Sequence, residues 1–119
     1  MSTGSVEVIG IDHIYVAVRD LRRSEEFYDR VMDALGYRKR TSMIAADPHV
    51  HYFNRQFGFS LRPARHGTPD HNPYAPGLHH FCFRVVDERT VRTIALDMDL
   101  GFRRIAYMGY GHQRGMIRY

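Results

Sequence analysis

Cysteine is scarce in this sequence of 119 residues, and long hydrophobic runs are absent from it. The single cysteine, Cys82, has no second cysteine in the chain with which to form a disulfide. The longest apolar run, residues 14–18, is far shorter than the roughly 20 residues that a membrane-spanning helix needs. Residues 1–10 lack the charged start and apolar stretch of a secretory signal. We therefore expect a cytoplasmic protein with no membrane partner.

Lysine is also rare, because sixteen of the seventeen cationic residues are arginine; thirteen acidic residues leave a net charge of +4. The basic clusters at residues 38–40 and 103–104 each follow a predicted helix, whose carbonyl end favours cations. A nucleic-acid site calls for a basic stripe with interleaved aromatic residues, and none is present. No phosphate-binding glycine loop follows a strand. We expect neither a nucleic-acid partner nor a nucleotide cofactor.

An internal repeat organises the chain. Residues 10–20 (GIDHIYVAVRD) align without a gap with residues 77–87 (GLHHFCFRVVD). The likeness continues to LGYRK at residues 35–39 and LGFRR at residues 100–104. Each copy therefore predicts a strand, a helix, a glycine that ends the helix, and a second strand.

The first strand and helix of the repeat are both amphipathic. Residues 11–18 place Ile14, Val16 and Val18 on one face, and His13, Tyr15 and Ala17 on the other. Asp20 is the predicted N-cap of the helix and Gly36 its stop. The helix carries an apolar stripe that we expect to pack on the apolar face of the strand: Phe27, Tyr28, Val31, Met32 and Leu35. The second copy repeats this arrangement with Asp87, Val91, Ile94, Ala95, Met98 and Gly101.

Two more strands follow the first copy, at residues 51–53 and 57–61, joined by a turn at residues 54–56. They complete a βαβββ module over residues 1–62. Residues 63–76 contain four prolines and form a predicted linker to a second module, residues 77–119. The prediction is an α+β fold in which two βαβββ modules form one structural domain, the second lacking its last strand.

The segments IDHIYVAV, SEEFYDRVMDALGY and GLHHFCFRV together resemble the vicinal oxygen chelate superfamily of glyoxalase, bleomycin-resistance and extradiol dioxygenase proteins. The resemblance covers residues 8–107. It implies paired βαβββ modules whose curved sheets enclose a cavity, with metal ligands, where present, on the cavity faces of the strands.

The resemblance assigns the first metal ligand to His13, and the internal repeat gives its mate as His80. Strand alternation places His80 with Cys82 and Arg84, and His79 on the opposite face. Two imidazoles joined by carboxylates suit a divalent ion such as Fe, Mn, Ni, Co or Zn and leave positions open for substrate oxygens.

The other ligands depart from the family pattern. The carboxylate that usually ends the fourth strand is replaced by Ser60, or by Gln56 in a shifted register, and the segment that carries the final ligand is missing. Candidates for a third ligand are His51, Gln56 and His112, with His49 next to His51. The same two strand histidines also fit a surface edge.

An incomplete second sheet would leave unpaired backbone groups along its edge. We expect a homodimer in which the partner closes this sheet; a truncated, poorly stable chain is the alternative. Four residues are predicted to line the pocket: Tyr15, Tyr52, Phe57 and Arg84. Arg84 offers a fork for a substrate carboxylate or phosphate, or forms a salt bridge at the rim.

Two functions remain open at this point. The first is a metal-dependent enzyme that chelates two neighbouring oxygens of a small substrate, with lyase, isomerase or dioxygenase chemistry. The second is a metal-free module of the bleomycin-resistance type that sequesters an aromatic or cationic small molecule. The histidine pair favours the enzyme, and the missing carboxylates favour the binding module; of the two, we prefer the metal-dependent enzyme on the sequence alone. No catalytic base is identifiable.

Overall fold

The computed structural model describes residues 4–84, 86, 107–108 and 115–118. The chain divides into two compact units, Met1–Thr68 and Pro69–Tyr119. The division falls within the predicted linker, residues 63–76. The predicted second helix, residues 88–100, with its cap Asp87 and stop Gly101, lies outside the described residues, as does His112. No helix in the described part of the chain is long and apolar enough to span a membrane.

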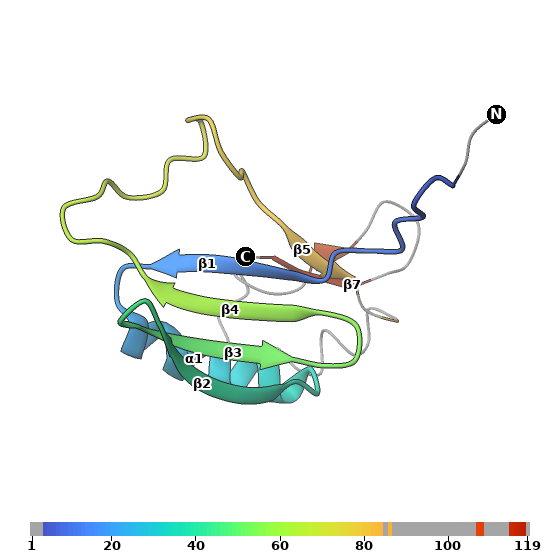
Figure 1. Ribbon diagram of the computed structural model, residues 1–119, viewed down its shortest axis with the longest axis horizontal. Coiled ribbons are helices and arrows are strands. Elements are labelled where there is room, and N and C mark those ends of the chain that lie inside the picture. The colour runs from blue at the N-terminus through green and yellow to red at the C-terminus, as the bar shows by residue number, and fades with distance from the viewer. Residues whose placement is uncertain (1–3, 85, 87–106, 109–114, 119) are drawn as a thin grey trace. The chain divides into compact units, whose positions relative to one another are not determined.

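The first unit contains one helix and four strands (Figure 1). They are β1 (His13–Val18), α1 (Leu21–Ala34), β2 (Arg38–Ile44), β3 (Asp47–Phe53) and β4 (Gly58–Pro63). The strands form one mixed sheet in the order β1-β4-β3-β2, in which β1 and β4 run parallel and the other neighbours antiparallel. This unit has the predicted α+β class and the predicted order of one strand, one helix and three strands.

Local sequence determines where α1 begins and ends. The side chain of the N-cap Asp20 accepts a hydrogen bond from the backbone N–H of Arg23 at 3.1 Å. At the other end Gly36 adopts a φ of 82°, a left-handed conformation that glycine takes without steric cost. The N–H groups of Gly36 and Tyr37 then donate to the carbonyls of Asp33 and Met32, respectively. Both predicted ends of the helix are confirmed.

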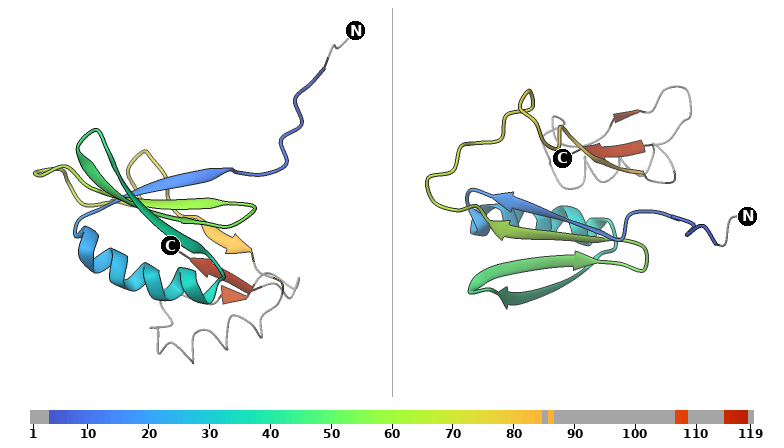
Figure 2. Two further views of the ribbon diagram at one scale, coloured as in Figure 1. Left: turned by 60° about the horizontal axis from the view of Figure 1, so that its bottom comes forward. Right: turned by 45° about the horizontal axis from the view of Figure 1, so that its top comes forward.

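The hydrophobic core lies between α1 and one face of the sheet (Figure 2). In the sheet register Phe59 lies opposite Ile14, and Leu61 lies between Val16 and Val50. The ring of Tyr28 on α1 lies 5.0 Å from the Phe59 ring, centroid to centroid. The buried apolar side chains are Val16, Val18, Val31, Met32, Val50, Tyr52, Phe59 and Leu61. The helix therefore packs on the face of the sheet that carries the buried apolar side chains of β1, Val16 and Val18.

Strand β3 begins at Asp47 and is therefore longer than the predicted strand at residues 51–53. It pairs with β2 along its full length. A two-residue turn at Ala45 and Ala46 joins the two strands, with φ angles of 50° and 66°. Such a turn usually contains Asn or Gly, so two alanines gave no turn signal. The next turn follows β3 at Asn54, whose side-chain oxygen accepts from the N–H groups of Gln56 and Phe57.

The second unit contains β5 (Cys82–Arg84), β6 (Tyr107–Met108) and β7 (Gly115–Arg118) in a three-stranded sheet of order β5-β7-β6. Strand β7 is antiparallel to both neighbours. The predicted strand over residues 77–87 is shorter in the structure, since residues 77–81 form no strand. The carbonyl of Leu78 accepts a hydrogen bond from His71 Nε2 at 2.9 Å, so it takes part in a loop contact instead of a strand ladder.

Candidate functional site

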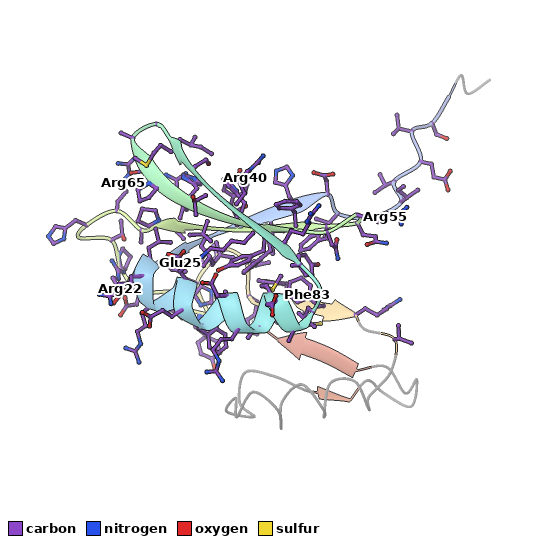
Figure 3. The ribbon with its side chains drawn as sticks, turned by 90° about the horizontal axis from the view of Figure 1, so that it is seen from below. Arg22, Glu25, Arg40, Arg55, Arg65 and Phe83 are labelled. Carbon is purple, nitrogen blue, oxygen red and sulfur yellow. The ribbon has the colours of Figure 1, made fainter. Side chains whose placement is uncertain are left out.

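The face of the β1–β4 sheet opposite α1 carries a row of polar side chains. In the register Tyr15 lies opposite Ser60, Ser60 opposite His51, and His51 opposite Arg40. This row crosses all four strands. Figure 3 shows Arg40 on the side of the sheet away from α1. Strand alternation therefore separates an apolar helix-covered face from a polar face that carries the candidate site.

A hollow of about 230 Å³ lies over this row, and we call it the sheet hollow. Its lining residues are His13, Tyr15, Arg40, His51, Tyr52, Phe53, Gly58 and Ser60. All of them belong to the first unit. The Arg40 guanidinium carbon lies 6.0 Å from the centroid of the Phe53 ring, a cation–π arrangement.

Both ring nitrogens of His51 contact serines. Its Nε2 lies 2.7 Å from Ser42 Oγ and its Nδ1 lies 2.7 Å from Ser60 Oγ. Burial lowers the pKa of His51, and the charges of Arg40 and His49 lower it further. A neutral imidazole with one N–H donor and one acceptor suits two hydroxyl partners. His51 has no free nitrogen for a metal unless a serine contact breaks.

His49 is buried beside His51, with the two rings stacked 5.8 Å apart. Its Nδ1 lies 3.0 Å from the backbone carbonyl of Asp47. Since a carbonyl oxygen only accepts, Nδ1 donates this hydrogen bond. The buried Nε2 has no hydrogen-bond partner among the residues that the structure describes. The Tyr15 ring makes edge-to-face contacts with both histidine rings, at 5.7 and 6.1 Å between centroids.

His13 stands at the start of β1 and is oriented by its neighbour. The Nδ1 atom lies 2.7 Å from a carboxylate oxygen of Asp12. A carboxylate on Nδ1 leaves Nε2 as the group that meets a ligand, proton or metal. Gly58 lies opposite His13, and a Cβ built on this glycine would be 3.2 Å from His13 Cβ. The missing side chain at Gly58 therefore keeps space beside the imidazole.

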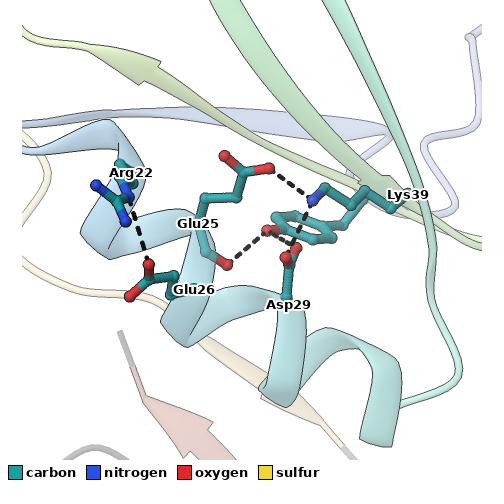
Figure 4. A network of polar contacts seen from close by, with 6 residues as sticks. Arg22, Glu25, Glu26, Asp29 and Lys39 are labelled. Atoms are coloured by element: carbon teal, nitrogen blue, oxygen red, sulfur yellow. Dashed lines mark hydrogen bonds and ion pairs between the residues drawn. The ribbon is translucent and has the colours of Figure 1, made fainter.

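Lys39, unlike its neighbour Arg40, points toward α1 and is held by two carboxylates (Figure 4). Its Nζ lies 2.6 Å from Glu25 Oε2 and 3.0 Å from Asp29 Oδ2. The bond to Glu25 raises the pKa of Lys39 most strongly, against a smaller lowering effect of burial. Successive residues of β2 thus have different roles: Lys39 ties the strand to the helix, and Arg40 faces the sheet hollow.

The structure brings only some of the predicted site residues together. His13, Tyr15 and His51 line the sheet hollow. Tyr52 also lines it, but its hydroxyl donates to Asp29 Oδ1 on α1 at 2.8 Å and is therefore not directed into the hollow. Phe57 and Gln56 lie in the turn after β3 and do not line it.

The predicted residues His80 and Arg84 belong to the second unit. His80 precedes β5, so strand alternation does not assign it to a face as expected from the sequence. Its Nδ1 instead lies 2.7 Å from Nδ1 of His79. Arg84 is an exposed residue of β5.

Arg40 and Ser42 were not predicted as site residues. They lie two residues apart on β2, so strand alternation places Arg40 and Ser42 on the same face, opposite to that of Lys39. The sequence contains no signal, however, that places this face opposite His51, because the strand register depends on the unrecognised turn at Ala45 and Ala46.

Within the described residues no group of three or more His, Cys, Asp or Glu side chains is arranged to hold a metal ion. Among the described histidines of the first unit, only His13 has a ring oriented by a carboxylate, that of Asp12, with its Nε2 left to meet a ligand. A complete metal site requires donors from elsewhere, with His80 as the predicted one.

No protein-family model matches the chain. Among solved structures, the chain is similar to the crystal structure of SMU.1112c, with a TM-score of 0.65 and 16% sequence identity. The match covers 95% of this chain and 92% of that chain. At this identity the likeness shows a shared fold and nothing about activity. The chain therefore has a known α+β fold.

Proposed function

We propose that this protein binds a small organic molecule in the sheet hollow. The observation that carries the proposal is the row Tyr15–Ser60–His51–Arg40, which combines aromatic surface with polar groups over a hollow. Small-molecule sites typically combine these two features. In the described residues, the Tyr15 hydroxyl has no hydrogen-bond partner, and neither does Nε2 of His13. Both groups are therefore available to a ligand.

The order of elements in the first unit supports the resemblance to the vicinal oxygen chelate superfamily. We propose that the second unit is the mate of the first, as the internal repeat indicates, so that the protein contains two related modules. If the protein is of the bleomycin-resistance type, the molecule in the sheet hollow is a ligand that the protein sequesters, not a substrate that it converts.

A screen of small aromatic compounds by ligand-observed NMR tests this proposal. We expect binders that lose affinity in Tyr15→Ala, because that change removes one wall of the sheet hollow. Tyr74→Ala is the matched control, since Tyr74 is an exposed tyrosine of the second unit. Binders that hold equally well to the Tyr15→Ala protein would contradict the proposal.

Metal-dependent chemistry is the second candidate function, and the contact between His13 and Asp12 favours it. Carboxylates on the distal nitrogen commonly orient metal-binding histidines. His13 and His80 would hold a divalent ion, which when bound acts as a Lewis acid for neighbouring substrate oxygens. The described residues supply no carboxylate ligand to this pair, so we place this function second.

Elemental analysis of protein purified without chelators or an affinity tag tests the metal. The metal-dependent function predicts stoichiometric metal in the natural protein and its loss in a His13→Ala, His80→Ala double variant. The His66→Ala protein, which loses an exposed loop histidine, serves as the control. Equal metal content in all three proteins would rule out the histidine pair as ligands.

We further propose that the protein forms a homodimer. Residues 6–11 expose four large apolar side chains, which are between 67% and 92% accessible: Val6, Val8, Ile9 and Ile11. Exposed apolar surface of this kind marks an interaction site more often than an isolated apolar residue does.

A further inference from the structure

The charge of the sheet hollow bears on the kind of ligand that it takes. Arg40 is its only lining residue with a permanent charge, and no Asp or Glu is among the lining residues. Within the described part of the chain, no carboxylate forms an ion pair with the Arg40 guanidinium. The guanidinium lies over the Phe53 ring.

Several other cations of the same unit form ion pairs. Lys39 contacts Glu25 and Asp29, Arg62 Nη2 lies 2.8 Å from Asp47 Oδ2, and Arg22 pairs with Glu26. These pairs occupy the helix side of the sheet, the end of β4 and the surface of α1. Arg40 differs from these cations, because it lines the sheet hollow and has an open position for an anion.

The two histidines that line the sheet hollow each have partners of their own. Burial, followed by the charges of Arg40 and His49, lowers the pKa of His51, which keeps that ring neutral. His13 already contacts the carboxylate of Asp12. Arg40 therefore supplies the permanent positive charge that a ligand meets in the sheet hollow.

The remaining lining adds apolar surface and sets the size of the ligand. Phe53 is 37% exposed and Tyr15 46% exposed, so both rings offer accessible aromatic surface. The hollow of about 230 Å³ is smaller than the roughly 300–1,000 Å³ of most ligand pockets. A molecule with a single ring matches this volume better than a polycyclic one.

We propose that the sheet hollow binds a small planar organic anion, such as an aromatic carboxylate, with its charge against Arg40 and its ring against Phe53 and Tyr15. This inference rests on the proposed small-molecule function and adds the ligand class. It keeps the aromatic ligand expected from the sequence and argues against the cationic one, which would meet the like charge of Arg40.

Three probes of nearly the same shape test the charge: benzoate, benzamide and benzylamine. Each is titrated into the isotope-labelled full chain at pH 7 while the amide NMR signals of Tyr15, His51 and Ser60 are followed. We expect benzoate to bind about tenfold more tightly than benzamide, and benzylamine most weakly, because an ionised partner strengthens a hydrogen bond. Added salt should weaken benzoate binding and leave benzamide binding unchanged.

Arg40→Gln should weaken benzoate binding about tenfold and leave benzamide binding unchanged. Arg40→Lys keeps the charge and should retain part of the affinity. Arg38→Gln is the matched control, because Arg38 belongs to the same strand but does not line the sheet hollow. The amide spectrum of each variant shows whether its fold is retained.

The outcomes separate this inference from the proposed function. Equal binding of the neutral or cationic probe, or full benzoate affinity in Arg40→Gln, overturns the anion assignment and leaves small-molecule binding in place. If none of the three probes shifts the three reporter signals, both the ligand class and the proposed site are wrong.

Discussion

The imidazole of His51 joins two strands through the hydroxyls of Ser42 and Ser60. Both serines meet it from opposite sides, on β2 and β4. Such a buried, fully bonded imidazole favours the neutral form, which matches the lowered pKa. The residue thus stabilises the polar face and leaves ligand contacts to its neighbours.

His51 should make the stability of the protein depend on pH. Because its pKa is lower in the folded state, the unfolded chain binds the proton at higher pH than the folded chain does. The free energy of unfolding should therefore fall as the pH drops below about 6.5, the ordinary pKa of histidine, and should show no contribution from His51 well above it. Urea unfolding between about pH 5 and 8 measures this slope.

The His51→Gln variant should lose part of the slope, since it keeps hydrogen-bonding capacity but removes the titrating group. His66→Gln, a change in an exposed loop, provides the comparison. An unchanged slope in His51→Gln would show that other groups cause the acid sensitivity.

Gly58 should be intolerant of even one added methyl group. An alanine Cβ would lie 3.2 Å from His13 Cβ, tighter than ordinary van der Waals contact. We expect Gly58→Ala to lower the free energy of unfolding by about 1 kcal/mol and to weaken ligand binding, because His13 must move. Gly10→Ala is the matched control, as a Cβ there meets no atom within 4 Å. Equal free energies of unfolding for the two variants, measured with urea, would contradict the close approach of Gly58 to His13.

At the scale of elements, α1 is tied to the sheet by polar contacts as well as by the core. Tyr52 on β3 donates to Asp29 on α1, and Lys39 on β2 binds the same carboxylate (Figure 4). Burial and the Asp29 carboxylate both raise the pKa of the Tyr52 hydroxyl, which stays protonated and acts as a donor. The basic cluster at residues 38–40 is therefore partly structural, not simply surface charge.

Tyr52→Phe should lower the free energy of unfolding by about 1 kcal/mol, since it removes a hydrogen bond to a partly exposed carboxylate. Tyr15→Phe removes a hydroxyl that has no partner in the described residues, and we expect a change below about 0.5 kcal/mol. Chemical unfolding of both variants makes the comparison. A larger effect at Tyr15 would mean that its hydroxyl has a partner in the folded protein.

The turn between β2 and β3 offers a stabilising substitution. Ala45 and Ala46 both adopt left-handed conformations, which cost residues with a Cβ about 1 kcal/mol or more each. The double change Ala45→Asn, Ala46→Gly should raise the free energy of unfolding by about 1 to 2 kcal/mol. Ala34→Gly, in the last turn of α1, should instead lower it by about 1 kcal/mol. A destabilising effect of the turn variant in thermal unfolding would contradict this turn geometry.

At the scale of the whole molecule, the exposed apolar residues 6–11 should govern self-association. We expect sedimentation equilibrium to give twice the mass of the chain. The double change Val8→Ser, Ile11→Ser should weaken the dimer at least about tenfold, because each side chain loses more than a kilocalorie of apolar burial. Tyr74→Ser, at another exposed site, should leave it intact. A monomeric natural protein would contradict the dimer.

Several parts of the fold could be predicted because they depend on neighbours in sequence. Asp20 and Gly36 determine the ends of α1 through backbone hydrogen bonds within one helical turn. Alternation along residues 13–18 determines which side chains of β1 face the helix and which face the sheet hollow. The polar character of one sheet face follows from the same period of two.

Tertiary structure decided which residues meet in the candidate site. Alternation assigns His51 and Arg40 each to a face of its own strand, but only the pairing of β2 with β3 places them opposite each other. That register follows from a turn of two alanines, and it also brings Ser42 to His51. A strand's own sequence determines its faces, whereas its neighbours across the sheet are determined by contacts between distant residues, which no local pattern encodes.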